Sequence, residues 1–249
     1  MSLSTKNGRF ASLFIKDFMG KKNKLSKFAD LLSFPNVLEN YDPKFPKLLI
    51  ARDEEIDLKG TWAEKYFQND HPIVVELACG RGEYTVSLAE ADPDKNFIGV
   101  DIKGARIWKG ASAALAKNLK NVAFLRTRIE QIALFFGSQE ISEIWITFPD
   151  PFLRESKEKK RLTSPRFLDL YRPLVKKGAL IHLKTDDPTL YHFTLQTLAD
   201  YPGAVIHYQN DDIYASPLSY DELQHTTYYE KEHLSKGKKI KYIRFSIDV

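Results

Sequence analysis

Short apolar runs and amphipathic stretches alternate along the chain from about residue 62 onward. Each apolar run has the length of a buried strand. The predicted strands are Ile73–Leu77, Asn96–Asp101, Val122–Arg126, 143–148, 179–185, 205–208 and Lys241–Ile247. The predicted helices between them are 83–90, 103–118, 129–136, Pro165–Tyr171 and 188–198. This alternation predicts an α/β fold with a doubly wound, mostly parallel, seven-stranded sheet.

Two of the predicted helices begin with a recognisable signal. Ser164 stands before Pro165, and Asp187 stands before Pro188. A Ser or Asp oxygen accepts hydrogen bonds from the free N–H groups at a helix start, and proline fits the first helical position. The sequence therefore predicts that Ser164 and Asp187 cap these helices.

The N-terminal part of the chain follows a different pattern. Apolar side chains separated by lysines over residues 9–32 predict one or two short amphipathic helices, interrupted near Gly20. Residues 33–60 contain three prolines and no sustained period, which predicts a connector with a strand at 47–51. The predicted division is a basic helical N-terminal extension with its connector, residues 1–60, and a catalytic domain, residues 61–249.

Composition narrows the class of protein. With 249 residues, 43% of them hydrophobic, the chain can bury one sizeable core. A single cysteine, Cys79, excludes a disulfide framework and a thiolate-rich zinc site, so we expect no metal and a reducing cytoplasm. No run approaches the roughly 18 apolar residues of a membrane span, and the N-terminus does not resemble a signal peptide. No membrane partner is expected.

Positive charge is distributed unevenly. The net charge is only +4, which does not by itself indicate a nucleic-acid partner. Residues 1–30 nevertheless contain seven basic and two acidic residues, and a second basic run spans residues 154–166. Charge alone does not show whether these runs are solvated surface or RNA contacts.

A turn of small residues follows the first predicted strand and opens a helix, where open α/β sheets bind ligands. Gly80 and Gly82 allow positive φ and a close approach of the backbone to a ligand. Asp101 ends the next strand, where its carboxylate can accept hydrogen bonds from both hydroxyls of a ribose.

Nicotinamide enzymes share this arrangement, but two details favour S-adenosylmethionine. A pyrophosphate site has a third glycine where this chain has Thr85. Glu76 places a negative charge at the strand end, which would repel a pyrophosphate and suits a sulfonium cation. Cys79 has no neighbouring base in the sequence, so we interpret it as a small apolar residue rather than a nucleophile.

Acidic residues end two further strands at the same edge of the predicted sheet. Asp150 is restricted by prolines on both sides, and Asp186 follows the fifth strand. The loop after Asp150 is dense in cations, which a plain turn does not explain, and its candidate RNA contacts are Lys157, Lys159, Lys160 and Arg161. A polar, aromatic cluster near the C-terminus, 227–230, is predicted to lie in a loop.

These motifs together, in this order, resemble bacterial tRNA (guanine-N7) methyltransferases, the TrmB family of class I methyltransferases. The long C-terminal hairpin region also agrees better with that Rossmann-like variant than with a six-stranded dinucleotide fold. The resemblance covers roughly residues 62–249, and residues 1–60 do not contribute to it. Its motifs are Glu76-Leu77-Ala78-Cys79-Gly80-Arg81-Gly82, Ile98-Gly99-Val100-Asp101, Phe148-Pro149-Asp150-Pro151, Lys160-Arg161-Leu162-Thr163, His182-Leu183-Lys184-Thr185-Asp186 and Thr227-Tyr228-Tyr229-Glu230.

The resemblance implies methyl transfer from S-adenosylmethionine to N7 of a guanosine in the tRNA variable loop. It implies that Glu76, Asp101 and Asp150 line the methyl-donor site. The residues implied to face the guanosine are Arg154, Asp186, Thr227 and Glu230. Guanine N7 carries a lone pair and no proton, so in-line attack needs no general base, and we expect Asp150 and Asp186 to act by electrostatics and orientation.

The chain departs from the family pattern at several positions. The family commonly has Gly where Ala78 stands, a harmless change if φ there is negative. It commonly has Trp, Lys and His where this chain has Phe152, Arg154 and Lys157. Near the adenine the family places an acid and a small residue, where this chain has Arg128-Ile129-Glu130; Ile129 and Glu130 are the candidate adenine contacts.

Other functions fit the same sequence. A class I methyltransferase could act on another RNA or on a small molecule, although the two basic runs favour a polyanion. A noncatalytic RNA-binding protein could use a decayed methyltransferase scaffold, although Glu76, the two turn glycines, Asp101 and Asp150 are all present. The accepted tRNAs, and whether the protein is a monomer or a homodimer, stay open.

Overall fold

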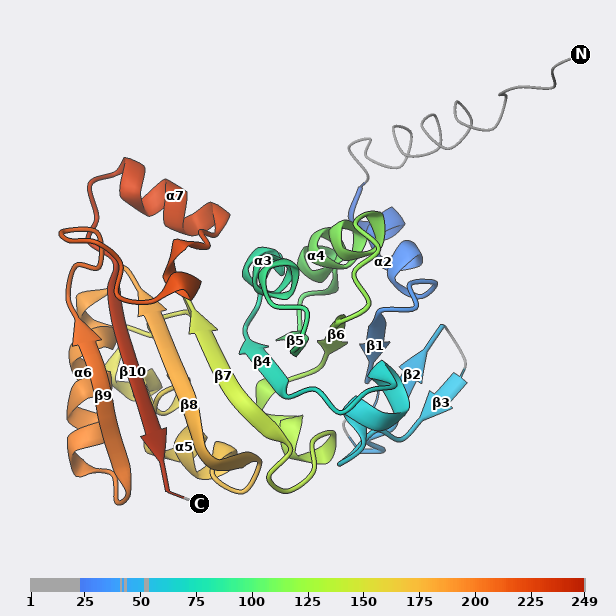
Figure 1. The fold of residues 1–249 in the computed structure, drawn as a ribbon, viewed down its shortest axis with the longest axis horizontal. Helices are drawn as coiled ribbons and strands as arrows, with labels where there is room; N and C mark the ends of the chain where they lie inside the picture. The colour runs from blue at the N-terminus through green and yellow to red at the C-terminus, as the bar shows by residue number, and fades with distance from the viewer. Residues whose placement is uncertain (1–22, 41, 43, 52–53, 249) are drawn as a thin grey trace, which may run out of the picture.

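The computed structural model describes residues 23–40, 42, 44–51 and 54–248. Within these residues, ten strands form a single sheet (Figure 1). They are β1 (Val37–Glu39), β2 (Leu48–Ile50), β3 (Glu54–Ile56), β4 (Ile73–Leu77), β5 (Asn96–Asp101), β6 (Val122–Arg126), β7 (Ile141–Thr147), β8 (Val175–Thr185), β9 (Ala204–Asn210) and β10 (Lys241–Ile247). Their order across the sheet is β3-β2-β1-β6-β5-β4-β7-β8-β10-β9.

The centre of the sheet is parallel and doubly wound. The strands from β1 through β6, β5, β4 and β7 to β8 are parallel, and β10 is antiparallel to both β8 and β9. The chain proceeds from β4 to β5 and β6 on one side, and then to β7 and β8 on the other. The topological switch point therefore lies at the carboxyl end of β4.

The α/β prediction is confirmed, but the sheet has ten strands rather than seven. The additional strands β1, β2 and β3 come from the predicted connector, and β2 corresponds to the strand predicted at 47–51. Each is three residues long, which is too short to show the alternation of apolar and polar residues that identifies a strand in the sequence. Because β1 pairs with β6, the connector is hydrogen-bonded to the main sheet.

Six helices accompany the strands in the described residues: α2 (Lys24–Leu31), α3 (Glu83–Ala91), α4 (Gly104–Ala116), α5 (Pro165–Tyr171), α6 (Pro188–Asp200) and α7 (Tyr228–Ser235). There is also a π-helical turn, η1 (Trp62–Phe67), and there are 3₁₀ segments η2 (Ile129–Leu134), η3 (Glu155–Lys160) and η4 (Asp221–Gln224). The predicted helix at 129–136 is thus a 3₁₀ segment, and α7 lies where a loop was predicted. Of the helices predicted within 9–32, residues 9–22 lie outside the described residues and α2 accounts for the rest.

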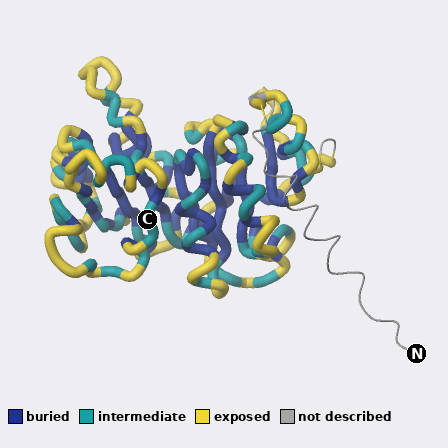
Figure 2. The backbone as a smooth tube through the Cα atoms, turned by 90° about the horizontal axis from the view of Figure 1, so that it is seen from above, coloured by how far each residue is buried: buried dark blue, intermediate teal, exposed yellow. Residues whose placement is uncertain are grey.

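Two apolar clusters hold the helices on the sheet. Side chains of η1, η2, α5 and α6 pack on one face, and those of α2, α3, α4 and η4 pack on the other. Figure 2 shows the buried residues running through the middle of the molecule, with the exposed residues around them. No helix in the described part of the chain combines the length and the apolar character that a bilayer crossing requires.

The two predicted helix caps have different outcomes. The Asp187 carboxylate accepts a hydrogen bond from the Leu190 N–H at 2.8 Å, as predicted. Ser164 occupies the N-cap position of α5, but its hydroxyl donates to the Lys159 carbonyl at 3.2 Å and makes no cap. The prediction for the Ser164 side chain was therefore wrong: its hydroxyl ties α5 to η3 instead.

Candidate active site

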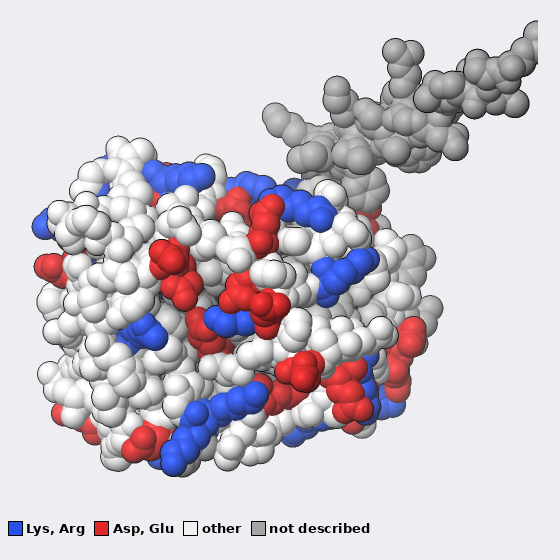
Figure 3. Space-filling model, viewed as in Figure 1, with Lys and Arg blue, Asp and Glu red and all other residues white. Residues whose placement is uncertain are grey.

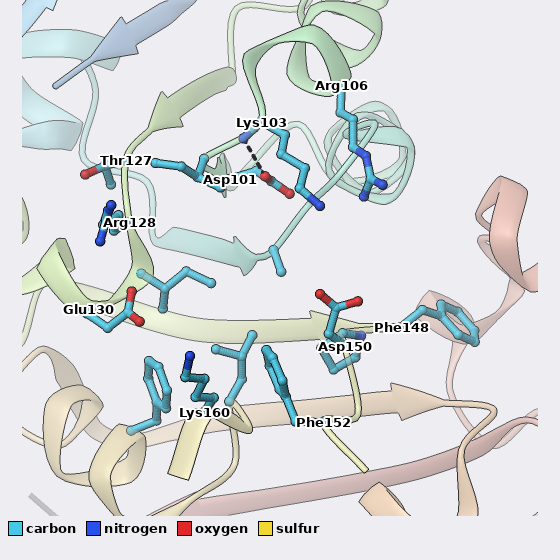
Figure 4. Close-up of a pocket in the computed structure, with 16 residues that line it drawn as sticks. Asp101, Lys103, Arg106, Thr127, Arg128, Glu130, Phe148, Asp150, Phe152 and Lys160 are labelled. Atoms are coloured by element: carbon cyan, nitrogen blue, oxygen red, sulfur yellow. Dashed lines mark hydrogen bonds between the residues drawn. The ribbon is translucent and has the colours of Figure 1, made fainter. Parts of the chain in front are cut away.

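A cavity of about 450 Å³ lies at the carboxyl ends of the central strands (Figure 4). Its walls include Ala78 after β4, Asp101 at the end of β5, Thr127 after β6 and Asp150 after β7. Each residue lies at the end of a parallel strand or in the loop that follows it, so the fold alone brings them together. This is the switch point at which open α/β sheets bind ligands.

Asp101 is held by the backbone around it. The Gly80 N–H donates to one carboxylate oxygen at 2.9 Å, and the Lys103 N–H donates to the other at 2.7 Å. The side chain is almost buried but lines the cavity. Each carboxylate oxygen has a second lone pair, so Asp101 can still accept hydrogen bonds from two adjacent hydroxyl groups.

The turn after β4 is built from left-handed backbone. Ala78, Gly80 and Gly82 have φ of 58°, 55° and 64°. A Cβ on Gly82 would collide with the Phe124 ring, so this glycine allows the turn to pack on the core and does not line the cavity. Ala78 does line it, and its positive φ means that the change from Gly to Ala costs about 1 kcal/mol.

Glu76 lies beneath this turn. Its carboxylate accepts hydrogen bonds from the Thr85 N–H at 2.9 Å, from the Thr85 hydroxyl, and from the Thr147 hydroxyl at 2.6 Å. Burial raises the pKa of Glu76 to about 7. Glu76 does not line the cavity, so it makes no direct contact with the space that a ligand would occupy there.

The segment after β6 borders the opposite end of the cavity from Asp150 in Figure 4. Ile129 and Glu130, the candidate adenine contacts, both line the cavity, together with Thr127 and Arg128. Thr127 was not predicted to line the site, although it follows β6 much as Asp101 ends β5.

A second cavity, of about 50 Å³, shares part of its wall with the first. Ala78, Arg106 and Phe148 line both cavities. The remaining lining residues of the small cavity are Cys79, Gly80, Arg81, Glu83, Thr147, Thr227 and Tyr229. Burial, with the nearby Glu76 and Asp101 charges, raises the pKa of the Cys79 thiol, which agrees with an inert apolar residue rather than a nucleophile.

The loop carrying Asp150 is constrained from both sides. Phe148 and Phe152 have φ of 48° and 45°, unfavourable values for aromatic residues. Arg161 is buried and donates to the carbonyls of Pro151 at 2.9 Å and Phe152 at 3.1 Å. Arg161, predicted as an RNA contact, is therefore not part of the exposed basic surface; it holds the loop in place.

The other cations of the basic loop are exposed. Lys157, Lys159 and Lys160 lie on η3, and Lys160 also lines the large cavity. Arg154 is exposed just before η3 and lines neither cavity. On the face in Figure 3, basic and acidic side chains are interspersed.

Asp186 follows β8 but does not line either cavity. Lys238 Nζ lies 2.5 Å from its carboxylate, and His233 Nδ1 lies 3.4 Å from it. The His233 ring stacks on the Phe148 ring, with 5.7 Å between ring centroids. Asp186 is therefore separated from the cavity wall by one layer of side chains, whereas Asp150 stands at the wall.

Thr227 and Glu230 form the N-terminal cap of α7. The Thr227 hydroxyl accepts a hydrogen bond from the Glu230 N–H at 3.1 Å, and the Glu230 carboxylate accepts one from the Thr227 N–H at 3.4 Å. Glu230 is completely buried, 2.8 Å from the ammonium group of the equally buried Lys184, and it accepts a hydrogen bond from the Tyr214 hydroxyl at 2.7 Å. Thr227 thus lines the small cavity, whereas Glu230 lies behind it.

Arg106 and Phe148 line the site but were not predicted to do so. Phe148 was predicted as the last residue of a strand, although a residue between a parallel strand and Pro149 leaves the sheet at its ligand-binding edge. Arg106 lies in the first turn of α4, five residues after Asp101. A cation in the first turn of the helix that follows Asp101 is a signal that the sequence did contain.

Comparisons with known proteins agree with this architecture. A family model described as a putative methyltransferase matches residues 70–243. The 16S rRNA methyltransferase KamB has a similar fold, with a TM-score of 0.60 and 14% identity over 79% of this chain and 97% of its own. The fold and the cavity therefore define a class I methyltransferase.

The sequence relatives give the family. The tRNA (guanine-N(7)-)-methyltransferase of Christiangramia forsetii is 48% identical over 230 residues, which cover 92% of this chain and 100% of that protein. The protein of that name from Bacteroides thetaiotaomicron is 47% identical, covering 91% and 86%. The one from Clostridioides difficile is 34% identical, covering 77% and 87%. The chain belongs to the tRNA (guanine-N7) methyltransferase family.

Proposed function

We propose that this protein transfers a methyl group from S-adenosylmethionine to N7 of a guanosine in the variable loop of tRNA. The proposal is carried by the presence of Asp101 and Asp150 in one cavity at the switch point of the sheet. It is supported by the 48% identity to a tRNA (guanine-N(7)-)-methyltransferase along the whole of that relative.

S-adenosylmethionine, when bound, supplies a methyl group on a positively charged sulfur. The residues present fit this group, because Asp101 has free lone pairs for a ribose and the Glu76 charge lies beneath the turn that borders the cavity. Gly80 lets the turn approach the ligand closely, and Gly82 packs that turn on the core. Ile129 and Glu130 border the adenine end.

Alignment of the guanine is the main catalytic task. N7 attacks directly, without a general base, and positive charge develops on the guanine ring. The Asp150 carboxylate at the wall stabilises this charge, and Asp186 acts on the same ring from behind Phe148 or after leaving Lys238. Arg154 and Thr227 orient the base, and Glu230 positions Thr227 through the α7 cap.

The tRNA backbone binds the exposed lysines of η3. The positive charges of these lysines lie beside the cavity, because Lys160 lines it and Lys157 and Lys159 belong to the same segment. None of the three makes an ion pair with a described residue. Such contacts give affinity without reading sequence.

The test combines labelled S-adenosylmethionine, bulk tRNA and nucleoside analysis, followed by single-turnover rates of variants. Wild type should yield N7-methylguanosine, and Asp150→Asn and Asp186→Asn should each slow transfer about ten- to a thousandfold. Asp187→Asn is the matched control, because Asn also caps helices well and Asp187 caps α6. Its rate should equal that of wild type.

Three results would contradict the proposal or its reaction centre. Methylation of another RNA, or of another base of tRNA, would give a different nucleoside in the same analysis. Binding of tRNA without any methyl transfer would favour a noncatalytic RNA-binding protein. Wild-type rates for both Asp150→Asn and Asp186→Asn across pH 6–9 would place the reaction centre elsewhere.

A further inference from the structure

Arg106 stands where the two cavities of the site meet. Its side chain is exposed, and it lines both the large cavity and the small one. It lies in the first turn of α4, on the element that follows Asp101. Figure 4 shows its guanidinium extending from α4 toward the loop that carries Phe148 and Asp150.

Arg106 has no ion-pair partner among the residues that the structure describes. The other arginine of the small cavity, Arg81, has its Nε 3.7 Å from the Glu83 carboxylate and its guanidinium 4.3 Å from the centre of the Tyr228 ring. Glu83 also accepts hydrogen bonds from Lys109 Nζ at 2.6 Å and from the Tyr228 N–H at 2.7 Å. Arg106, by contrast, makes no ion pair with any residue that the structure describes.

The two cavities together match the two parts of a nucleoside linked to an amino acid. The large cavity contains Asp101 for the ribose, so the chain attached to that ribose must extend past Ala78 toward the small cavity. The amino-acid end of such a ligand carries an ammonium group and a carboxylate. Glu76 and the acids at the strand ends suit the cationic groups, but the carboxylate needs a cation.

We infer that Arg106 binds the carboxylate of the methionyl group of S-adenosylmethionine and thereby fixes that end of the molecule. The planar guanidinium can donate two parallel hydrogen bonds to a carboxylate, which gives direction as well as affinity. This inference rests on the proposed use of S-adenosylmethionine. It assigns Arg106 to the methyl donor rather than to RNA, because Arg106 borders the small cavity behind the turn, whereas the lysines of η3 lie outside it.

The test removes the Arg106 side chain and the carboxylate of the ligand, first separately and then together, as in a double-mutant cycle. Calorimetry would give the Kd of S-adenosylmethionine and of its decarboxylated analogue, which lacks only the carboxylate, for wild type and Arg106→Ala. Wild type should bind S-adenosylmethionine about ten- to a hundredfold more tightly than the analogue. Arg106→Ala should lose this preference and bind the analogue as wild type does.

Arg128→Ala is the matched control. Arg128 is an exposed arginine that lines the large cavity but not the small one, so its removal should leave the preference for the carboxylate intact. Melting temperatures would confirm that both variants fold, as expected for exposed side chains.

The inference is overturned if Arg106→Ala keeps the wild-type preference. It is also overturned if this variant loses affinity for tRNA alone, because Arg106 would then bind an RNA phosphate. In both cases wild type still binds S-adenosylmethionine, and the proposed function stands. Wild type that binds neither S-adenosylmethionine nor the analogue would overturn the proposed function together with the inference.

Discussion

Glu76→Gln is expected to stabilise the fold above neutral pH. It should also remove the part of the pH dependence of stability that the Glu76 carboxyl causes. Glu76 is 3% exposed, and its carboxyl group accepts hydrogen bonds from Thr85 and Thr147. Burial raises the pKa of this carboxyl from 4.5 to about 7 in the folded protein. Gln has the same shape and no charge, and it can keep the bond from the Thr85 N–H while donating to the Thr147 hydroxyl.

The sign of this effect on stability follows from the pKa of the Glu76 carboxyl in the unfolded chain and in the folded protein. The unfolded chain loses this proton near pH 4.5, and the folded protein holds it until about pH 7. The contribution of Glu76 to stability is therefore complete below about pH 4.5 and is lost as the pH rises through about 7. The difference in pKa corresponds to roughly 3 kcal/mol at pH 8.

Urea unfolding of both proteins at pH 5 and pH 8 measures this effect. The stability of Glu76→Gln relative to wild type should rise by roughly 2 to 3 kcal/mol between the two pH values. The other titrating groups are common to both proteins and cancel in the comparison. An unchanged difference would show that the Glu76 carboxyl is ionised at pH 5 in the folded protein, and would refute the reasoning.

The remaining predictions concern the turn, the α7 anchor and the basic loop. Ala78→Gly should raise the free energy of unfolding by about 1 kcal/mol, because φ there is 58°, and a lower urea midpoint would contradict it. Lys184→Met and Glu230→Gln should each cost about 3–5 kcal/mol by leaving one buried charge unpaired, whereas the double variant should recover most of the loss in urea unfolding. Neutralising Lys159 and Lys160 together should flatten the slope of log K for tRNA against log salt by about 1–2 units, and an unchanged slope would make them ordinary surface.

The buried strands were the most predictable part of the fold. β4, β5 and β6 were predicted with the observed bounds, because each is a nearly continuous apolar run that needs cover on both faces. The ends of the predicted strands placed Asp101 and Asp150 at one edge of the sheet. That both line one methyl-donor site was implied by the resemblance to the family, and both line the large cavity.

Helix α7 could have been predicted and was not. Thr227 and Glu230 stand three residues apart, which is the sequence signal of a capping box, and the structure has both hydrogen bonds of that motif. The resemblance to the family led to a substrate-contact interpretation of the same two residues. The capping box depends only on residues that are neighbours in the chain, whereas a substrate contact depends on the whole fold.

The roles of the charged motif residues could not be separated by local reasoning. Glu230 pairs with Lys184, Asp186 with Lys238, and Arg161 with carbonyls of the Asp150 loop, so each orientation depends on a partner from a different segment. A charged residue near a site lowers its energy either by facing a charged ligand or by pairing within the protein, and the sequence is compatible with both. The structure shows that Arg161 and Glu230 pair internally and thereby fix the Asp150 loop and the start of α7. Arg106 and Lys160 line the cavity without such a partner among the described residues. The cations without an internal partner are the ones that a negatively charged ligand can bind without breaking an existing ion pair.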